Sequence, residues 1–177
     1  GLFVSVDLAS AEQAQASVHR VIEHFGRIDS LVNSAAVTSR GSYLDTTPEL
    51  FDQHVNVNLR APFFTMAETI KHLTSRGVGG TIVNIITMSA LGGQPYLAPY
   101  VATKAGLVGA TKNAAHAHRW DRIRINGLNI GWTATAGEAD IQKKFHGADD
   151  NWLAEAEAQQ PMGKLGKPEE IAEFVSF

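Results

Sequence analysis

Apolar positions along this chain follow two patterns that alternate. In four segments they recur every three or four residues, which predicts helices at 10–25, 48–75, 99–118 and from 168 onward. Four shorter and more continuous apolar runs predict strands at 1–8, 28–33, 81–86 and 122–129. The stretch from 133 to 160 is polar and less regular, and we expect it to be helical in pieces.

Local signals mark where the helices begin and end. Ser10 can cap the first helix, and Gly26 can end it in the left-handed conformation. Thr47 followed by Pro48 is typical of a helix start, because proline suits the first helical position. Pro62 lies inside the second helical pattern, so we expect a kink there.

The alternation of strands and helices predicts the fold class. We expect an α/β, Rossmann-like, doubly wound parallel sheet with helices on both faces. In such sheets, ligands bind outside the carboxyl ends of the strands. That rule selects Asp7, Asn33–Ala36, Thr87–Ser89 and Gly131–Thr135 as candidate site positions before any motif is considered.

The composition excludes several classes of protein. Hydrophobic residues make up 44% and charged residues 19%, which excludes a disordered chain. The net charge is −3 without any basic stripe, so we expect no nucleic-acid partner, and the apolar runs are too short to span a membrane. The absence of Cys fits a reducing compartment, the cytoplasm. His116 and His118 do not share a helix face, and we expect no metal site.

Tyr100 and Lys104 carry the strongest chemical signal. They stand four residues apart in a predicted helix, so their side chains share a face. A free phenol is a poor base at neutral pH, because its pKa is about 10. A neighbouring ammonium favours the phenolate, which makes the pair a plausible proton-transfer unit. The alternative interpretation is an ordinary pair on a helix surface.

Motifs around this pair favour the chemical interpretation. Thr87 ends the most apolar strand, where its hydroxyl can meet a substrate oxygen. The segments 25–36, 57–63 and 124–135 read FGRIDSLVNSAA, VNLRAPF and RINGLNIGWTAT. In this order and spacing, the pair, Thr87 and these segments resemble the short-chain dehydrogenase/reductase family in its compact form, over nearly the whole chain.

The resemblance implies an oxidoreductase that transfers hydride between NAD or NADP and a secondary alcohol or ketone. Tyr100 corresponds to the catalytic acid/base, and Lys104 to the partner that eases its deprotonation and holds the nicotinamide ribose. Thr87 stands where the family usually has a Ser that orients the reacting oxygen. Asn58 matches the residue that organises a water relay to the lysine.

A local feature of the chain also supports a role for Asn58. Pro62 has no N–H, so the backbone carbonyl of Asn58 loses its helical donor and can bind water. The alternative is that Pro62 only bends the helix around the core.

The resemblance further implies a set of cofactor contacts. The matching positions are Asp7 and Leu8 near the adenine, Asn33 and Ala35 beside the adenosine ribose, and Thr133 and Thr135 near the nicotinamide amide, together with Tyr100 and Lys104.

The chain departs from the family pattern at several positions. Residues 33–36 lack the second Asn and the final Gly of the family turn, and Ile130 stands where Pro is usual. Ser89 is an alternative to Thr87, although the spacing favours Thr87. The glycine-rich pyrophosphate turn that the family places before Asp7 is absent, and with it the residue that would choose between NAD and NADP.

The ends of the chain indicate one incomplete domain over residues 1–177. The chain starts inside a predicted strand without an initiator Met, and the last helix stops after a few turns. We therefore expect an internal piece of a dinucleotide-binding and catalytic domain. Within it, residues 136–160 are expected to form a lid over the substrate.

Two other functions stay open. A non-catalytic relative could use the same fold to sense nucleotides or to scaffold an assembly, but it would not need Tyr100, Lys104, Asn58 and a hydroxyl at position 87 together. A sugar-nucleotide epimerase or dehydratase is disfavoured, because such relatives usually carry a larger substrate domain. A polyol, a sugar, a hydroxy acid or an acyl chain would all be compatible as the small-molecule substrate.

The sequence also predicts association. Two helices carry more apolar and small side chains than one sheet face can cover, namely Met66, Ile70 and Leu73 on the first and Ala102, Leu107, Ala110 and Ala114 on the second. An apolar surface left open favours association, and the resemblance implies that these helices pair with their copies about a two-fold axis. We expect a homodimer or homotetramer. The alternative is that both surfaces pack inside one subunit.

Overall fold

The computed structural model describes residues 1–176. Phe177, the end of the predicted last helix, lies outside the described residues. The chain divides into two compact units, Gly1–Leu128 and Asn129–Phe177, and each is described by itself.

The elements follow the predicted alternation of helices and strands. The first unit contains α1 (Ala11–Phe25), β1 (Ser30–Asn33), α2 (Pro48–Val55), the π-helical turn η1 (Asn56–Arg60), α3 (Ala61–Arg76), β2 (Gly80–Thr87), α4 (Ser89–Gly92), α5 (Ala98–Ala117), the 3₁₀ turn η2 (Arg119–Asp121) and most of β3 (Ile123–Ile130). The second unit contains α6 (Ala136–His146), α7 (Trp152–Ala158) and α8 (Pro168–Ser176).

The predicted end signals of the first two helical segments are confirmed. The Ser10 side chain accepts the backbone N–H of Gln13 at the start of α1, and Gly26 ends that helix at φ 74°. Thr47 caps α2 in the same way, with Pro48 at the first helical position. Just before Pro62, where a kink is expected, the structure contains the π-helical turn η1, in which the Ala61 N–H donates to the carbonyl of Asn56.

The predicted strand at 1–8 is wrong. Residues 1–7 have no regular structure, and the chain then turns into α1. The Asp7 carboxylate accepts the N–H of Ala9 at 2.9 Å, and the Asp7 carbonyl accepts the N–H of Ser10 at 3.1 Å. An alternating pattern forms a strand only where a neighbouring strand supplies hydrogen-bond partners, and the sheet of the described chain consists of β1, β2 and β3.

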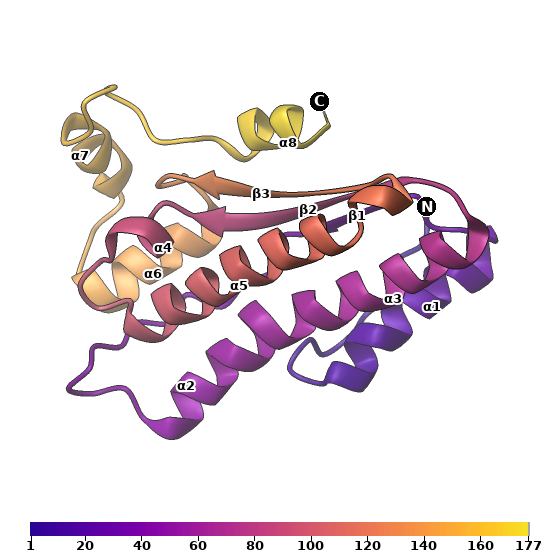
Figure 1. Ribbon diagram of the computed structural model, residues 1–177. Coiled ribbons are helices and arrows are strands. Elements are labelled where there is room, and N and C mark those ends of the chain that lie inside the picture. The colour runs from indigo at the N-terminus through magenta and orange to yellow at the C-terminus, as the bar shows by residue number, and fades with distance from the viewer. Residues whose placement is uncertain (177) are drawn as a thin grey trace. The chain divides into compact units, whose positions relative to one another are not determined.

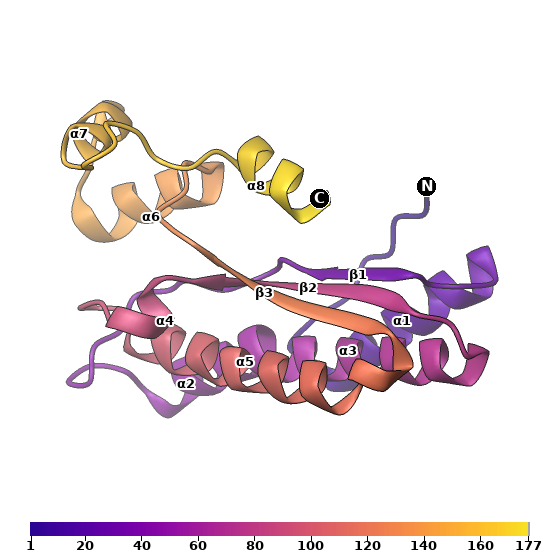
Figure 2. The same cartoon turned by 45° about the horizontal axis from the view of Figure 1, so that its top comes forward.

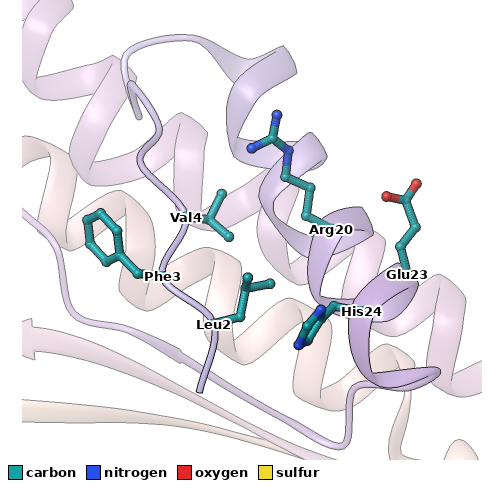
Figure 3. Close-up of a pocket in the computed structure, with 6 residues that line it drawn as sticks. All are labelled: Leu2, Phe3, Val4, Arg20, Glu23 and His24. Atoms are coloured by element: carbon teal, nitrogen blue, oxygen red, sulfur yellow. The ribbon is translucent and has the colours of Figure 1, made fainter.

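The irregular N-terminal segment forms an open hollow with α1. Its walls are Leu2, Phe3 and Val4 on one side and Arg20, Glu23 and His24 on the other (Figure 3). None of the candidate site residues lines this hollow.

The sheet has the strand order β1-β2-β3. β1 and β2 run parallel, with Leu31 opposite Ile82, and the arrows of β2 and β3 point the same way (Figure 1). α3 and α5 pack against one face of the sheet, and α1 packs against α3 (Figure 2). The carboxyl ends of β1 and β2 therefore open towards the loops that lead into α2 and α5.

The hydrophobic core lies between the sheet and these two helices. Its buried members are Met66, Ile70, Leu73, Ile82, Ile86, Leu107, Ile123 and Ile125. This corrects the predicted contact surface, because Met66, Ile70, Leu73 and Leu107 are buried inside one chain. Ala110 and Ala114 are partly buried and pack against the same core, whereas Ala102 is exposed. The stripe of large apolar residues on α3 belongs to the sheet face, as the alternative interpretation proposed.

The second unit contains a loop that is closed at its base. Thr133 pairs with Gly166 in a parallel bridge, in which Gly166 bonds to Ala134 and Trp132 through its carbonyl and its N–H at 2.9 Å each. The segment between them holds α6 and α7, which agrees with the prediction of helical pieces at 133–160. The rings of Trp132 and Trp152 lie 6.4 Å apart inside this unit.

Within residues 1–176, no helix combines the length and the apolar character that crossing a bilayer requires.

Glu68 joins α1 to α3. Its carboxylate accepts hydrogen bonds from Lys71 at 2.8 Å and from Gln15 at 2.9 Å, and it lies 3.0 Å from a ring nitrogen of His19. These bonds, from Lys71 first, then His19 and Gln15, lower the pKa of the nearly buried carboxyl to about 2.

Replacing this carboxylate should weaken the fold in a pH-dependent way. Because the pKa falls from 4.5 to about 2 on folding, the stabilisation is complete above pH 4.5 and disappears as the pH drops through 2. Glu68→Gln should lower the free energy of unfolding by about 1 to 2 kcal/mol at pH 7, since Lys71 and His19 are solvent-exposed. Urea unfolding at several pH values, with Glu23→Gln as an exposed control on α1, measures this. A deficit that does not shrink on acidification contradicts it.

Candidate active site

Four predicted site residues gather at the carboxyl end of β2. Thr87 ends that strand, Tyr100 and Lys104 lie on the first turns of α5, and Asn58 lies in η1. η1 packs against α5, and α5 packs against β2 (Figure 1). Residues far apart in the sequence are thus brought to one end of the sheet.

Lys104 is held between α5 and β2. Its side chain is only 2% exposed, and Nζ donates to the backbone carbonyl of Ile85 at 2.8 Å. The same Nζ lies 5.8 Å from the centre of the Tyr100 ring. Burial lowers the pKa of Lys104 to about 8, because water no longer solvates its charge fully. At pH 7 the ammonium is still the main form, and it is a desolvated positive charge beside a phenol.

Asn58 fixes the loop that follows β1. It is fully buried, and its side-chain amide makes a pair of bonds to the backbone of Val37, accepting the N–H at 2.8 Å and donating to the carbonyl at 2.9 Å. The Asn58 side chain is therefore structural, and a contact between its backbone carbonyl and water stays a prediction. Pro62, four residues on, has no N–H to offer the Asn58 carbonyl.

Thr103 connects Asn58 to the turn of α5 that carries Tyr100. The Thr103 hydroxyl lies 3.5 Å from the Asn58 amide nitrogen, and it lies within donor range of the carbonyls of Pro99 at 3.0 Å and Tyr100 at 2.9 Å. Sequence reasoning missed this residue. The signal in the sequence was a threonine directly before Lys104 in a predicted helix. In the structure, it lies on the helix face that η1 covers.

The hydroxyls of Thr87 and Ser89 are used differently. The Thr87 oxygen accepts the backbone N–H of Ser89 at 3.2 Å, so its own hydrogen can be donated to another oxygen. The Ser89 hydroxyl donates to the side chain of Gln94 at 2.9 Å. This geometry favours Thr87 as the donor to a substrate oxygen.

The predicted adenosine-side residues have other neighbours as well. The Asn33 side chain turns inward, where it donates to Asn84 and accepts from Thr65, each at 2.8 Å. The Asn33 side chain is therefore engaged in hydrogen bonds inside the fold. Ala35 is exposed after the end of β1, and Asp7 and Leu8 lie in the turn that leads into α1.

The two remaining predicted residues belong to the second unit. Thr133 forms the bridge to Gly166, and its hydroxyl donates to the carbonyl of Gly131 at 3.2 Å. Thr135 caps α6, because its side chain accepts the N–H of Glu138 at 3.0 Å.

Comparison with known proteins assigns the chain to a family. The family model described as enoyl-(acyl carrier protein) reductase matches residues 1–177. The chain belongs to the short-chain dehydrogenase/reductase family, as its motifs predicted.

Named relatives share this family at moderate identity. An uncharacterized oxidoreductase of Thermotoga maritima is 33% identical over 167 residues, which cover 94% of this chain and 66% of that protein. The 2-dehydro-3-deoxy-D-gluconate 5-dehydrogenase of Escherichia coli (strain K12) is 29% identical over 176 residues, 99% of this chain and 68% of that protein. The chain spans about two thirds of the length of the curated relatives it matches.

A solved structure confirms the Rossmann-like α/β fold. The structure described as ElxO with NADP bound superposes with a TM-score of 0.87 at 28% sequence identity. The match covers 99% of this chain and 69% of that one.

Substitutions at positions 87 and 89 separate the two hydroxyls. In the complete protein, Thr87→Ser should keep most activity, whereas Thr87→Val should lower kcat/KM about a hundredfold, because Val keeps the shape and removes the hydrogen-bond donor. Ser89→Ala is the matched control and should have little effect. If Ser89→Ala is damaging and Thr87→Val is silent, Ser89 is the residue that binds the reacting oxygen.

Proposed function

We propose that the protein transfers hydride between NAD or NADP and a secondary alcohol or ketone, with Tyr100 as the acid/base. One observation carries this proposal: the buried Lys104 ammonium lies 5.8 Å from the Tyr100 ring, next to the end of the strand that presents the Thr87 hydroxyl. A desolvated positive charge beside a phenol favours the phenolate. Nothing in a sensor or scaffold requires a lysine to be buried beside a tyrosine.

The residues present fit a nicotinamide cofactor. Lys104 donates to a neutral carbonyl, so its remaining hydrogens can meet ribose hydroxyls. The turn after β1 has small side chains, including the exposed Ala35, and its backbone can approach a ligand closely. We propose Asp7, Leu8, Asn33 through its backbone, Ala35, Thr133 and Thr135 as further contacts. When bound, the nicotinamide ring donates or accepts the hydride.

In this proposal, each residue of the group has one role. The Thr87 hydroxyl donates a hydrogen bond to the reacting oxygen and orients it. The Tyr100 phenol gives a proton to that oxygen during ketone reduction, and the Tyr100 phenolate takes one from the alcohol during oxidation. The ammonium of Lys104 favours the deprotonated state of the phenol. A water bound to the backbone carbonyl of Asn58 would take part in a relay that returns a proton from solvent to Tyr100 by way of Lys104.

The relatives support this class of reaction. The Escherichia coli relative is named a dehydrogenase of a sugar acid, and a relative from Sphingomonas is named L-rhamnose 1-dehydrogenase (NAD(P)(+)). Both names describe the dehydrogenation of a sugar or a sugar acid, which is the class of reaction that we propose.

Removing the Tyr100 hydroxyl tests the reaction. In the complete protein, Tyr100→Phe should leave cofactor binding nearly unchanged and should lower turnover at least about a hundredfold, because only the proton donor is lost. The measurement is the change in nicotinamide absorbance with a panel of alcohols and ketones, with binding followed separately by fluorescence. Tyr43→Phe removes a hydroxyl from a side chain that is 93% exposed, and it serves as the control. Turnover of Tyr100→Phe within tenfold of the parent refutes the assignment.

We also propose a cytoplasmic homodimer or homotetramer in which the outer face of α5 meets its copy. That face carries small residues that are not buried, Ala102, Ala105, Gly106 and Gly109. Small side chains let two helices approach closely. This surface replaces the buried stripe of α3 as the contact region.

A charge on this face tests the assembly. Nothing lies within 4 Å of a Cβ built at Gly109, so Gly109→Glu fits the single chain and also improves helix propensity. We expect the mass from light scattering to fall to that of the monomer without a loss of thermal stability. Gly137→Glu, at an equally open position on α6, is the control and should leave the mass unchanged. A parent that is monomeric at micromolar concentration contradicts the proposal.

A further inference from the structure

Tyr96 has an unfavourable backbone conformation for an aromatic residue. Its φ is +61°, in the left-handed region that favours glycine, and Arg122 is the other non-glycine residue with positive φ in the described chain. Arg122 lies in the turn before β3, where its guanidinium donates to the carbonyl of Gly77. Tyr96 lies instead in the segment between Thr87 and Tyr100, at the carboxyl end of β2.

The surrounding backbone holds Tyr96 in place. The N–H of Gly41 donates to the Tyr96 carbonyl at 2.8 Å, and the N–H of Ala98 donates to the Gly41 carbonyl at 2.9 Å. Between them, Leu97 is 6% exposed. Gly41 cannot be replaced easily, since a Cβ there would lie 2.6 Å from the hydroxyl oxygen of Thr46. The loop after β1 thus clamps the segment that leads into α5.

Burial of the ring does not compensate for this strain. The Tyr96 side chain is 63% exposed, so the fold gains little packing from it. Strained residues persist where the surroundings over-determine them, and they cluster at ligand-binding sites. Met88 at 54% and Leu91 at 63% are exposed in the same segment, directly after Thr87. Three large apolar side chains of the segment between Thr87 and Tyr100 are therefore exposed to solvent.

We propose that Tyr96 is a specificity residue whose ring forms, with Met88 and Leu91, an apolar wall beside the candidate site. This wall favours substrates that carry a ring or an alkyl chain next to the reacting carbonyl over small polyols with the same reacting group. The inference rests on the proposed function, because Thr87 and Tyr100 define where the reacting carbonyl lies. The backbone bonds to Gly41 explain how an unfavourable φ is retained: they fix the backbone that carries the ring before the substrate arrives, so less ordering accompanies binding.

A binding experiment tests the wall without turnover. The probe is benzylacetone, a methyl ketone with a phenyl flank, and the readout is broadening of its phenyl proton resonances by this chain. We expect the broadening to be lost in Tyr96→Gly and Tyr96→Asn, which suit the left-handed conformation, and kept in Tyr96→Phe. Trp120→Ala removes another exposed aromatic, 84% exposed beyond the other end of α5, and should change nothing. Equal broadening by the parent and by Tyr96→Gly overturns the inference.

A kinetic experiment in the complete protein tests selectivity. The ratio of kcat/KM for benzylacetone to that for hydroxyacetone, a methyl ketone with a hydroxyl flank, should fall at least fivefold in Tyr96→Gly and stay the same in Trp120→Ala. The melting temperature should not fall, because glycine relieves the strain, whereas a merely structural ring would lower it on removal. If the parent oxidises or reduces other compounds of the panel but prefers hydroxyacetone or accepts neither ketone, this inference is wrong and the proposed function stands. If the parent transfers no hydride with any compound, the proposed function fails, even where benzylacetone binds.

Discussion

The buried Asn84 side chain is the centre of a hydrogen-bond network that joins α5, β2, β1 and α3, and the packing of α3 and α5 against the sheet depends on this network. Thr111 lies within donor range of the Leu107 carbonyl, so its oxygen accepts from the Asn84 amide nitrogen at 2.9 Å. The Asn84 oxygen must then face Asn33, whose own oxygen accepts from Thr65. The Thr111 hydroxyl on α5 thereby determines which atom donates in the next two hydrogen bonds, from Asn33 to Asn84 and from Thr65 to Asn33. A buried polar group left without its partner is costly, so this network is compatible with only one register of the helices against the strands.

The same strand then places the chemistry. Asn84, Ile85 and Thr87 are near neighbours on β2, and each serves the fold or the site in a different way. Asn84 sets the packing register, the carbonyl of Ile85 holds Lys104, and Thr87 presents its hydroxyl at the strand end. A shift of α5 along β2 would break the bond to Thr111 and the bond to Lys104 together. The position of Tyr100 relative to Thr87 therefore depends on the buried hydrogen bond between Asn84 and Thr111 as well as on the bond of Lys104 to Ile85.

The sequence predicted the elements where local chemistry decides them. Ser10 and Gly26 bound a helix because a cap and a left-handed glycine act within a few residues. The strand at 1–8 and the contact stripe through Met66 failed for a shared reason. Both depend on what lies opposite: a strand needs a neighbour, and an apolar helix face can meet its own sheet or another chain. The spacing of apolar residues identifies neither the neighbouring strand nor the surface that the helix packs against.

The same distinction holds at the candidate site. Residue type states what a side chain can donate or accept, and together with motif spacing and the resemblance to the family it selected Thr87, Tyr100, Lys104 and Asn58 as candidates. Which partner it finds depends on tertiary approach, so Thr135 caps a helix and the amide of Asn33 turns into the core. The backbone conformation of Tyr96 is harder still to predict from the sequence, because it depends on the hydrogen bond that Gly41 of the loop after β1 makes to it.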